Sequence, residues 1–365
     1  MSARRAGMSV LAGDLFGDLD LQACCPSVRV SNYPQGLSEV LAAAPAGPWM
    51  YTGALENYPQ LIERMESLGQ LWGNTAHCLR RVRDPVAVFL ALRRHGLAAP
   101  PIAEHAEDLP TDGTWLVKHR RSAGGSGVAP WRGGASASPH VYFQRRVDGQ
   151  PCSAVYVASA GQAAFLGATQ QLLGGGSPNA DDFHYTGSVG PLSLEPAILK
   201  AFQDVGHALA TEFPLSGLFG VDAVVADQIV WPVEVNPRYT ASVEILERAS
   251  RQSLLACHAA ACVGQLPPAA PIDAQPGGRW SPKIVWGKRI LFAHQDLEIG
   301  REAIEHFLSA IADTTDPPIA DIPPAGLQIP SGRPVLTVFA CGKCPAEVQA
   351  ALAERAERVE RLLYR

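Results

Sequence analysis

Apolar and polar residues alternate with two different periods along this chain, and the change of period predicts strands followed by helices. In the first 80 residues, buried strands are predicted at three short apolar runs, 9–13, 27–30 and 49–52. Amphipathic helices are predicted at 36–44 and 58–68. This order predicts an open α/β unit. Gly13-Asp-Leu-Phe-Gly17 follows the first strand in place of Gly-x-Gly-x-x-Gly, so the unit has no dinucleotide fingerprint.

The rest of the chain predicts a β-rich middle unit and a smaller C-terminal unit. Strands are expected at 115–118, 141–144, 153–157 and 163–166, with a loop at 174–178. A hairpin of strands 220–225 and 229–235 is expected to turn at Ala226-Asp-Gln228. Helices are expected at 85–95, 195–213, 241–263 and 345–363. The predicted domains are therefore 1–80, 81–275 and 276–365.

The composition excludes several classes of partner. The formal net charge of the 365 residues is -5, which gives no electrostatic support for a nucleic-acid partner. The hydrophobic share is 47% and the charged share 18%, as in a compact soluble protein. No apolar run approaches the roughly 20 residues that span a bilayer, and Val10 to Ala12 is too short for the apolar core of a secretory signal. We therefore expect a cytoplasmic protein without a membrane partner.

The eight cysteines are spread too widely to form a disulfide framework, so we expect reduced thiols. Cys341-Gly-Lys-Cys344 is the only C-x-x-C sequence. A zinc site would need two further ligands, and a redox motif would be expected to open a helix early in a βαβ unit. We interpret Cys341 and Cys344 as an incidental pair in a turn, and any role for them stays open.

The first segment with candidate chemistry is a strand that delivers Lys118 to a glycine-rich loop. The loop contains Gly124, Gly125, Ser126 and Gly127. Glycines allow backbone N–H groups to approach phosphate oxygens closely, and the ammonium adds a point charge. No Gly-Lys-Ser/Thr closes the loop, and the lysine precedes the glycines, so neither a Walker A loop nor a protein-kinase pair is present. A tight turn beside a snorkelling lysine is the alternative.

The second segment is the hairpin with Asp222 on one strand and Glu234 and Asn236 on the other. The period of two places Glu234 and Asn236 on one face, with Asp222 across the hairpin. Two carboxylates and an amide oxygen are the hard ligands that magnesium takes, and phosphates and waters complete its octahedron. Arg238, beyond the strand end, could reach a transferring phosphoryl group. The alternative is a solvent-facing hairpin, which Asn236-Pro237 makes unattractive as strand sequence.

In this order the two segments resemble the ATP-grasp superfamily, whose members include biotin carboxylase and D-alanine–D-alanine ligase. The resemblance covers about residues 80–265, and Glu234-Val-Asn-Pro-Arg238 is its most specific part. It implies an ATP-grasp fold, α/β and α+β in class, with an N-terminal pre-ATP-grasp domain and a glycine-loop lid at about 112–150. It also implies that ATP and Mg²⁺ are the cofactors.

The resemblance assigns roles to the residues of both segments. Lys118 would contact the α/β-phosphates, and the loop from Gly124 to Gly127 would close over the β/γ-phosphates. Asp222, Glu234 and Asn236 would bind one or two Mg²⁺ ions. Arg238 would stabilise the acyl phosphate and its transition state.

The resemblance extends to a hinge at 141–149, where Gln144 replaces the usual acid. Its amide oxygen could still accept from the adenine amino group, and the backbone of Arg145 and Arg146 would pair with the adenine edge. Gln150-Pro-Cys-Ser153 stands where an acid commonly holds the ribose. Ribose recognition is therefore left without an assigned residue.

Further residues have two interpretations. Arg83 stands where many members carry a second nucleotide-binding lysine, or it is a solvated charge before a helix. Glu56 and Asn57 follow a strand end in the first unit, where they contact substrate or Asn57 caps a helix. His184 lies where members line the acceptor site, or it belongs to a plain loop. His119 points away from Lys118 and is interpreted as structural.

We therefore expect an ATP- and Mg²⁺-dependent carboxylate-amine ligase that acts through an acyl phosphate. Its partners would be small-molecule carboxylate and amine substrates, with a homodimer as one candidate assembly. A nucleotide-binding regulatory or scaffold protein and a bicarbonate-activating carboxylase are the alternatives. Three short segments, 13–18, 52–57 and 83–85, are loosely similar to predicted carboligases. Some of these occur with one-carbon cofactor synthesis of the tetrahydromethanopterin or methanofuran type.

Overall fold

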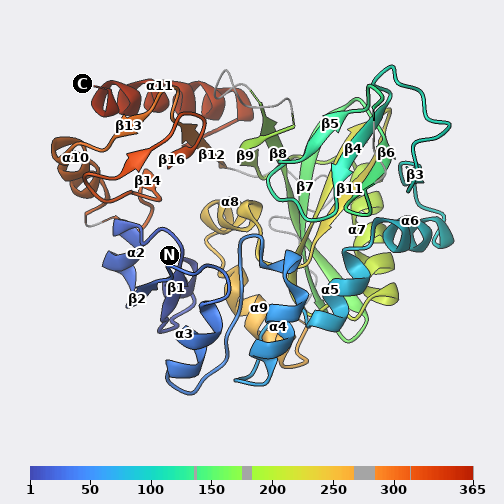
Figure 1. Ribbon diagram of the computed structural model, residues 1–365, viewed down its shortest axis with the longest axis horizontal. Helices are drawn as coiled ribbons and strands as arrows, with labels where there is room; N and C mark the ends of the chain where they lie inside the picture. Colours follow the sequence, from blue (N-terminus) through green and yellow to red (C-terminus); the bar gives the residue numbers. More distant parts are fainter. Residues whose placement is uncertain (135–137, 175–182, 267–283, 313, 365) are drawn as a thin grey trace.

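The computed structural model describes residues 1–134, 138–174, 183–266, 284–312 and 314–364. The loop expected at 174–178 therefore lies outside the described residues beyond Gly174. Figure 1 shows the N-terminal part in blue at the bottom, the lid strands at the upper right and the C-terminal part in red at the upper left. No helix in these ranges is long and apolar enough to cross a bilayer.

The central element is an eight-stranded antiparallel sheet in the order β11-β10-β7-β8-β9-β12-β16-β14. The five strands at the β11 end of this order are β7 (Gln150–Ser159), β8 (Gln162–Leu173), β9 (Tyr185–Gly190), β10 (Gly217–Ala226) and β11 (Ile229–Asn236). Helix α7 (Pro196–Glu212) packs on it through Phe202, which stacks on Phe165. Helix α8 (Ala241–Ser250) joins it through Ser242, whose hydroxyl lies 2.8 Å from that of Thr169. The main apolar core lies between this sheet and its helices.

A separate four-stranded sheet carries the glycine loop. Its strands are β3 (Ile102–Ala103), β6 (Val141–Arg145), β4 (Trp115–His119) and β5 (Val128–Pro130), in that order. Two helices, α5 (Ala76–Val82) and α6 (Pro85–Arg94), precede it. Asp84 accepts from the N–H of Val86 and Pro85 occupies the first turn, so α6 begins where the sequence predicts.

The N-terminal part contains less sheet than the sequence predicts. Its strands are β1 (Ala12–Asp14) and β2 (Ser27–Arg29), and its helices are α1 (Ser2–Arg5), α2 (Leu19–Cys24), α3 (Leu37–Ala43), η1 (Leu55–Asn57) and α4 (Pro59–Glu66). The strand expected at 49–52 is only a parallel bridge between Trp49 and Leu71. The prediction that the other two strands are buried was wrong, because Val10 and Val28 are 39% and 42% exposed. A two-stranded ribbon offers little face for helices to cover.

The C-terminal part continues the central sheet. Its strands there are β12 (Val285–Phe292), β14 (Ile319–Ala320) and β16 (Pro334–Gly342), and β12 pairs with β9. Helix α11 (Pro345–Leu363) packs on β12 and β16, as the sequence predicts for the final helix. Helix α10 (Arg301–Ile311) and a pair of short strands, β13 (Leu297–Glu298) and β15 (Gln328–Ile329), complete this part.

The prediction of a single helix at 241–263 was wrong, because the structure has two helices there. Arg251 has a φ of 61° and separates α8 from α9 (Leu254–Cys262). The buried carboxylate of Glu247 accepts from the N–H groups of Leu254 and Leu255 and so caps the second helix from within the first. Since no glycine or proline marks the break, the hydrophobic pattern alone could not reveal it.

Candidate active site

Two carboxylates face each other at one edge of the central sheet. Asp222 on β10 is the direct register partner of Glu234 on β11, and a bulge follows Asp222. The hairpin turns at Asp227 and Gln228, both with positive φ, so the strand pairing matches the predicted hairpin.

The two carboxylates have different charge environments. Burial and the nearby charge of Glu234 raise the pKa of Asp222 to about 6. Burial would also raise the pKa of Glu234, but the cations of Arg83, Lys118 and Arg238 hold it below its usual value. The pair therefore keeps Glu234 ionised and leaves Asp222 short of compensating positive charge.

Asn236 lies between the carboxylates and Arg238. Its Nδ2 donates to Asp222 Oδ2 at 3.0 Å, and its Oδ1 accepts from Arg238 at 3.4 Å. The amide nitrogen, and not the predicted oxygen ligand, therefore faces Asp222. No group of three or more His, Cys, Asp or Glu side chains suited to a metal ion occurs in the described part of the chain, so the candidate metal site rests on two carboxylates and this amide.

Arg238 lies beyond the strand end and is paired with Glu56. Arg238 Nε lies 2.7 Å from Glu56 Oε1, although the two residues are 182 positions apart. Glu56 is 2% exposed, and its Oε2 has no hydrogen-bond partner among the residues that the structure describes. The structure thus brings a sequence-predicted substrate residue directly to the sequence-predicted phosphoryl residue.

Lys118 connects the lid sheet to the central sheet. Its Nζ donates to the carbonyl of Val233 at 3.1 Å and to Gln144 Oε1 at 3.2 Å. Gln144 Nε2 donates to the same carbonyl at 3.3 Å. Burial opposes the charge of Lys118, but Tyr142 and Glu234 keep its pKa above the usual value. The lysine is therefore a charged group at the junction of the two sheets, next to the carboxylate pair.

The glycine loop has a conformation that requires glycine. Gly124, Gly125 and Gly127 have φ values of 62°, 79° and 76°. A Cβ on Gly125 would lie 1.8 Å from the carbonyl oxygen of Phe183, whereas one on Gly124 would meet nothing within 4 Å. The N–H of Tyr185 donates to the carbonyl of Gly124 at 3.0 Å. The loop is thus held against the start of β9, and Ser126 Oγ bonds within the loop to the carbonyl of Ala123.

Arg83 and Asn57 join the lid to the carboxylate pair. Arg83 donates to Glu234 Oε1 at 2.6 Å and to the carbonyl of Val235 at 3.2 Å. Asn57 accepts from Arg83 at 3.3 Å, and its Nδ2 donates to the carbonyl of Ser122 at 3.1 Å. Arg83 is 13% exposed in its side chain, so it is not a solvated surface charge. Asn57 does not cap α4, which has no side-chain cap bond.

A hollow lies where the lid sheet, α5–α6 and β11 meet. Its polar lining includes Arg83, Tyr142, Gln144 and Glu234. Its apolar lining comes mainly from α6 and the start of the lid, with Val88, Phe89, Leu92, Pro100 and Ile102. An apolar wall beside a few convergent polar groups is typical of a small-molecule site.

Three predicted residues lie in other contacts. The N–H groups of Arg145 and Arg146 donate to the carbonyls of Pro101 and Thr114, both at 2.9 Å. These two donors are therefore already used, and the pairing of this backbone with adenine stays a prediction for the carbonyl groups. His184 packs edge-on against Phe292, with ring centroids 5.2 Å apart, and shows no contact with the carboxylate pair. His119 is exposed, packs beside Gly127 and also lines the hollow, so its structural interpretation stays a prediction.

Sequence reasoning missed three residues near the site. Tyr142 lies with its ring 5.7 Å from Lys118 Nζ. It precedes Gln144 by two positions on β6, so strand periodicity could have identified it. Ser153 and Gln171 hydrogen-bond Asp222 and counteract the rise of its pKa. No sequence pattern could have identified Ser153 and Gln171, because their contacts with Asp222 depend on how β7 pairs with β10 and β8 pairs with β7.

Comparisons with known proteins agree with this architecture. Residues 82–242 match the family model described as the ATP-grasp domain. The structure resembles the biotin carboxylase domain of Hydrogenobacter thermophilus 2-oxoglutarate carboxylase, with a TM-score of 0.72 at 10% identity over 98% of this chain and 85% of that chain. It also resembles Thermotoga maritima phosphoribosylamine–glycine ligase, with a TM-score of 0.68 at 14% identity over 98% of this chain and 92% of that chain.

A third similar structure is Thermus thermophilus N5-carboxyaminoimidazole ribonucleotide synthetase, with a TM-score of 0.65 at 16% identity over 100% of this chain and 94% of that chain. A search of curated protein sequences gives no significant match. Residues 82–242 thus form an ATP-grasp domain, and the chain has an ATP-grasp fold. The fold is similar to that of a biotin carboxylase domain, a phosphoribosylamine–glycine ligase and an N5-carboxyaminoimidazole ribonucleotide synthetase.

Proposed function

We propose that this chain is an ATP- and Mg²⁺-dependent ligase that phosphorylates a carboxylate and transfers the acyl group to an amine. The observation that carries the proposal is the placement of Asp222 opposite Glu234, beside Lys118, Arg83 and Arg238. Two facing carboxylates and three cations at the junction of two sheets match the needs of a metal-bound triphosphate. A scaffold protein that binds ATP without turning it over would have no reason to keep all three candidate metal ligands, Asp222, Glu234 and Asn236.

The carboxylate pair fits a divalent cation. The raised pKa of Asp222 reflects burial and the repulsion between two facing acids, which a cation between them would relieve. Asp222 and Glu234 would hold Mg²⁺, and the amide of Asn236 would turn its oxygen toward it. When bound, Mg²⁺ neutralises phosphate charge.

The remaining residues would position the reactants. Lys118 and Arg83 would bind phosphate oxygens, and the Gly124–Gly127 loop would cover them. A carboxylate oxygen of the substrate attacks the γ-phosphorus and ADP leaves. The amine nitrogen then attacks the acyl carbon, inorganic phosphate leaves, and the amine gives up a proton. Arg238 would stabilise the phosphoryl group in transit, and Glu56 and Asn57 would line the acceptor side.

Three finer proposals accompany this function. The substrates belong to one-carbon cofactor synthesis, on the strength of the loose similarity at 13–18, 52–57 and 83–85. Bicarbonate is the second candidate for the activated carboxylate, since the Hydrogenobacter domain was solved with MgADP and bicarbonate. That domain is described as a dimer, and a homodimer is proposed here on the same analogy.

Phosphate release provides the test. The protein is incubated with ATP, Mg²⁺ and pairs of carboxylates and amines, including amino acids, bicarbonate and pterin or furan precursors. Phosphate release that depends on both substrates supports the ligase. Release with bicarbonate alone favours the carboxylase. No release with any pair, together with tight ATP binding, favours a scaffold and contradicts the proposal.

A further inference from the structure

Three consecutive residues of the loop between β11 and α8 are each held by the first 80 residues. Asn74 Nδ2 donates to the carbonyl of Pro237 at 2.9 Å. Arg238 pairs with Glu56, and the hydroxyl of Tyr239 lies 2.7 Å from Ser2 Oγ. Three of the four residues between β11 and α8 are therefore each held by a distant part of the chain.

The orientation of Asn74 is fully determined by its other contacts. Asn74 is 1% exposed, and its Oδ1 accepts from the N–H of Ser216 at 2.9 Å. Its own carbonyl accepts from the hydroxyl of Tyr51 at 2.7 Å. Because its amide oxygen is already used by a backbone donor, the amide nitrogen must face Pro237.

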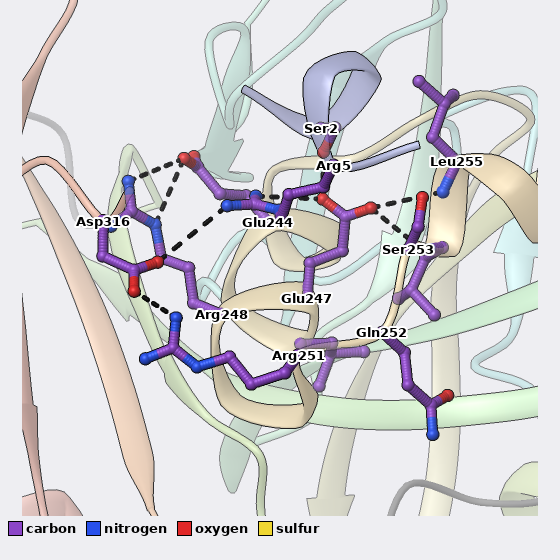
Figure 2. Close-up of polar contacts among 12 residues, drawn as sticks. Ser2, Arg5, Glu244, Glu247, Arg248, Arg251, Gln252, Ser253, Leu255 and Asp316 are labelled. Carbon is purple, nitrogen blue, oxygen red and sulfur yellow. Dashed lines mark hydrogen bonds and ion pairs between the residues drawn. The ribbon is translucent and has the colours of Figure 1, made fainter. Parts of the chain in front are cut away.

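The contact of Ser2 has a definite donor. The Ser2 hydroxyl donates its one proton to the carboxylate of Glu247, so the Tyr239 hydroxyl must donate to Ser2 Oγ. Glu247 has no exposed surface and also accepts from Arg5 at 3.2 Å, as Figure 2 shows. Ser2, on the short helix α1, is thus held between the buried carboxylate of Glu247 and the hydroxyl of Tyr239.

Helix α8, on the far side of the loop, is fixed as well. The buried Arg248 donates to Glu244 at 3.1 Å and to the carbonyl of Pro317 at 3.1 Å. Its guanidinium lies 3.8 Å from the ring centre of Phe339 on β16. Arg251 pairs with Asp316 (Figure 2). Because these contacts hold α8 in place, we expect a displacement of Tyr239 to be absorbed within the loop itself.

Such a displacement would reach the site through Arg238. Arg238 donates to the carbonyl of Tyr239 at 3.3 Å and to Asn236 Oδ1 at 3.4 Å. Arg238 is thus supported on one side by Tyr239 and on the other by a candidate metal ligand. Small losses of placement at a phosphoryl-transfer site reduce turnover more than they reduce binding.

We propose that Ser2 and Asn74 are positioning residues, which hold Tyr239 and Pro237 so that Arg238 and Asn236 keep their places in the site. The inference rests on the proposed function. Neither residue contacts the reactants. Their effect is expected in kcat, with the KM for ATP nearly unchanged, because Lys118 and the glycine loop are untouched.

The test is a double-mutant cycle of Ser2→Ala and Tyr239→Phe, with Ser250→Ala as the matched control. Ser250→Ala also removes a part-buried hydroxyl from α8, but this hydroxyl donates to the carbonyl of Leu246 within the same helix. Each cycle variant is expected to lower kcat by about 3- to 10-fold, the range for one hydrogen bond. The double variant should lose no more than the larger single loss. Ser2→Thr, which keeps the hydroxyl, should restore kcat.

Hydrogen exchange without substrate separates this inference from the proposed function. The amides from Arg238 to Ala241 should exchange faster in Ser2→Ala and in Asn74→Ala than in the wild type. If the wild type turns over no substrate, the proposed function fails, and faster exchange still supports the positioning contacts. Unchanged exchange overturns the inference. Additive losses in the cycle, or an equal loss in Ser250→Ala, overturn it too.

Discussion

Arg83 donates to Glu234 at 2.6 Å, which joins the C-cap residue of α5 to a strand residue 151 positions later. The candidate phosphate cation and the candidate metal ligand are therefore one ion pair before any nucleotide binds. Both side chains are mostly buried, 13% and 26% exposed, and the cation of Arg83 helps to hold the pKa of Glu234 below its usual value. Mutations at the carboxylates should therefore affect chemistry more than folding.

Asp222→Asn and Glu234→Gln should each reduce ATP turnover to background, because either change removes a metal ligand charge. Both variants keep the shape of the side chain, so circular dichroism should match that of the wild type. Asp204→Asn is the control, since Asp204 pairs only with Lys200 on the surface of α7. Wild-type turnover in both site variants would refute the metal assignment.

Asp222→Asn should also change stability with pH in the absence of nucleotide. The pKa of Asp222 is raised from 3.8 to about 6, so the folded state favours the neutral form. As the pH rises from about 4 to 6, the wild type loses the stability that the neutral form of Asp222 contributes, and above pH 6 none of this contribution remains. The variant should have a larger free energy of unfolding at pH 8, by about 1–3 kcal/mol. Urea denaturation should show no such gain at pH 4.

Lys118→Ala should weaken ATP binding by roughly 1–3 kcal/mol, the range for a charge-assisted hydrogen bond. Calorimetry with a non-hydrolysable ATP analogue measures it. Lys200→Ala removes an exposed lysine that is 69% accessible and should leave affinity unchanged. Equal affinities in all three proteins would exclude Lys118 from the nucleotide site.

Gly125→Ala should impair the loop far more than Gly124→Ala. Both residues have positive φ, so each substitution costs about 1–2 kcal/mol of backbone strain. Only the Gly125 variant also collides with the carbonyl of Phe183. We expect at least a tenfold lower kcat/KM for ATP in Gly125→Ala than in Gly124→Ala. Indistinguishable kinetics would show that the loop does not act in its observed position.

Arg238→Lys should lower kcat by on the order of 100-fold, with a smaller change in the KM for ATP. A guanidinium can contact Glu56 and a phosphoryl group at once through separate nitrogens, and an ammonium reproduces this geometry poorly. Steady-state kinetics over a range of ATP concentrations resolves the two parameters. A change confined to KM would make Arg238 a nucleotide-binding residue.

The elements that could be predicted from the sequence are those whose local residue pattern matches their backbone conformation. The hairpin from Gly217 to Asn236 was predictable because its alternation is regular, and so was the opposition of Asp222 and Glu234. The start of α6 at Pro85 was marked by an N-cap and a proline. The glycine loop was recognisable because its backbone angles allow few other residues.

The features that could not be predicted from the sequence depend on contacts between distant segments. The Glu56–Arg238 and Arg83–Glu234 pairs cross 182 and 151 positions, and no local pattern encodes them. The break between α8 and α9 was missed because Arg251, and not a glycine, ends α8, and because the buried Glu247 caps α9. The sequence also could not show that the N–H groups of Arg145 and Arg146 donate to Pro101 and Thr114, because these partners lie 44 and 32 positions earlier.

The pairing of β12 with β9 has a consequence for any shortened form of this protein. A chain cut after α9 would contain the whole matched ATP-grasp domain, yet it would leave β9 as a bare sheet margin. Val189 on that strand has no exposed surface in the full chain, and it would then face water. An open hydrophobic margin invites strand addition by a neighbouring molecule. The shortened protein should therefore self-associate during expression.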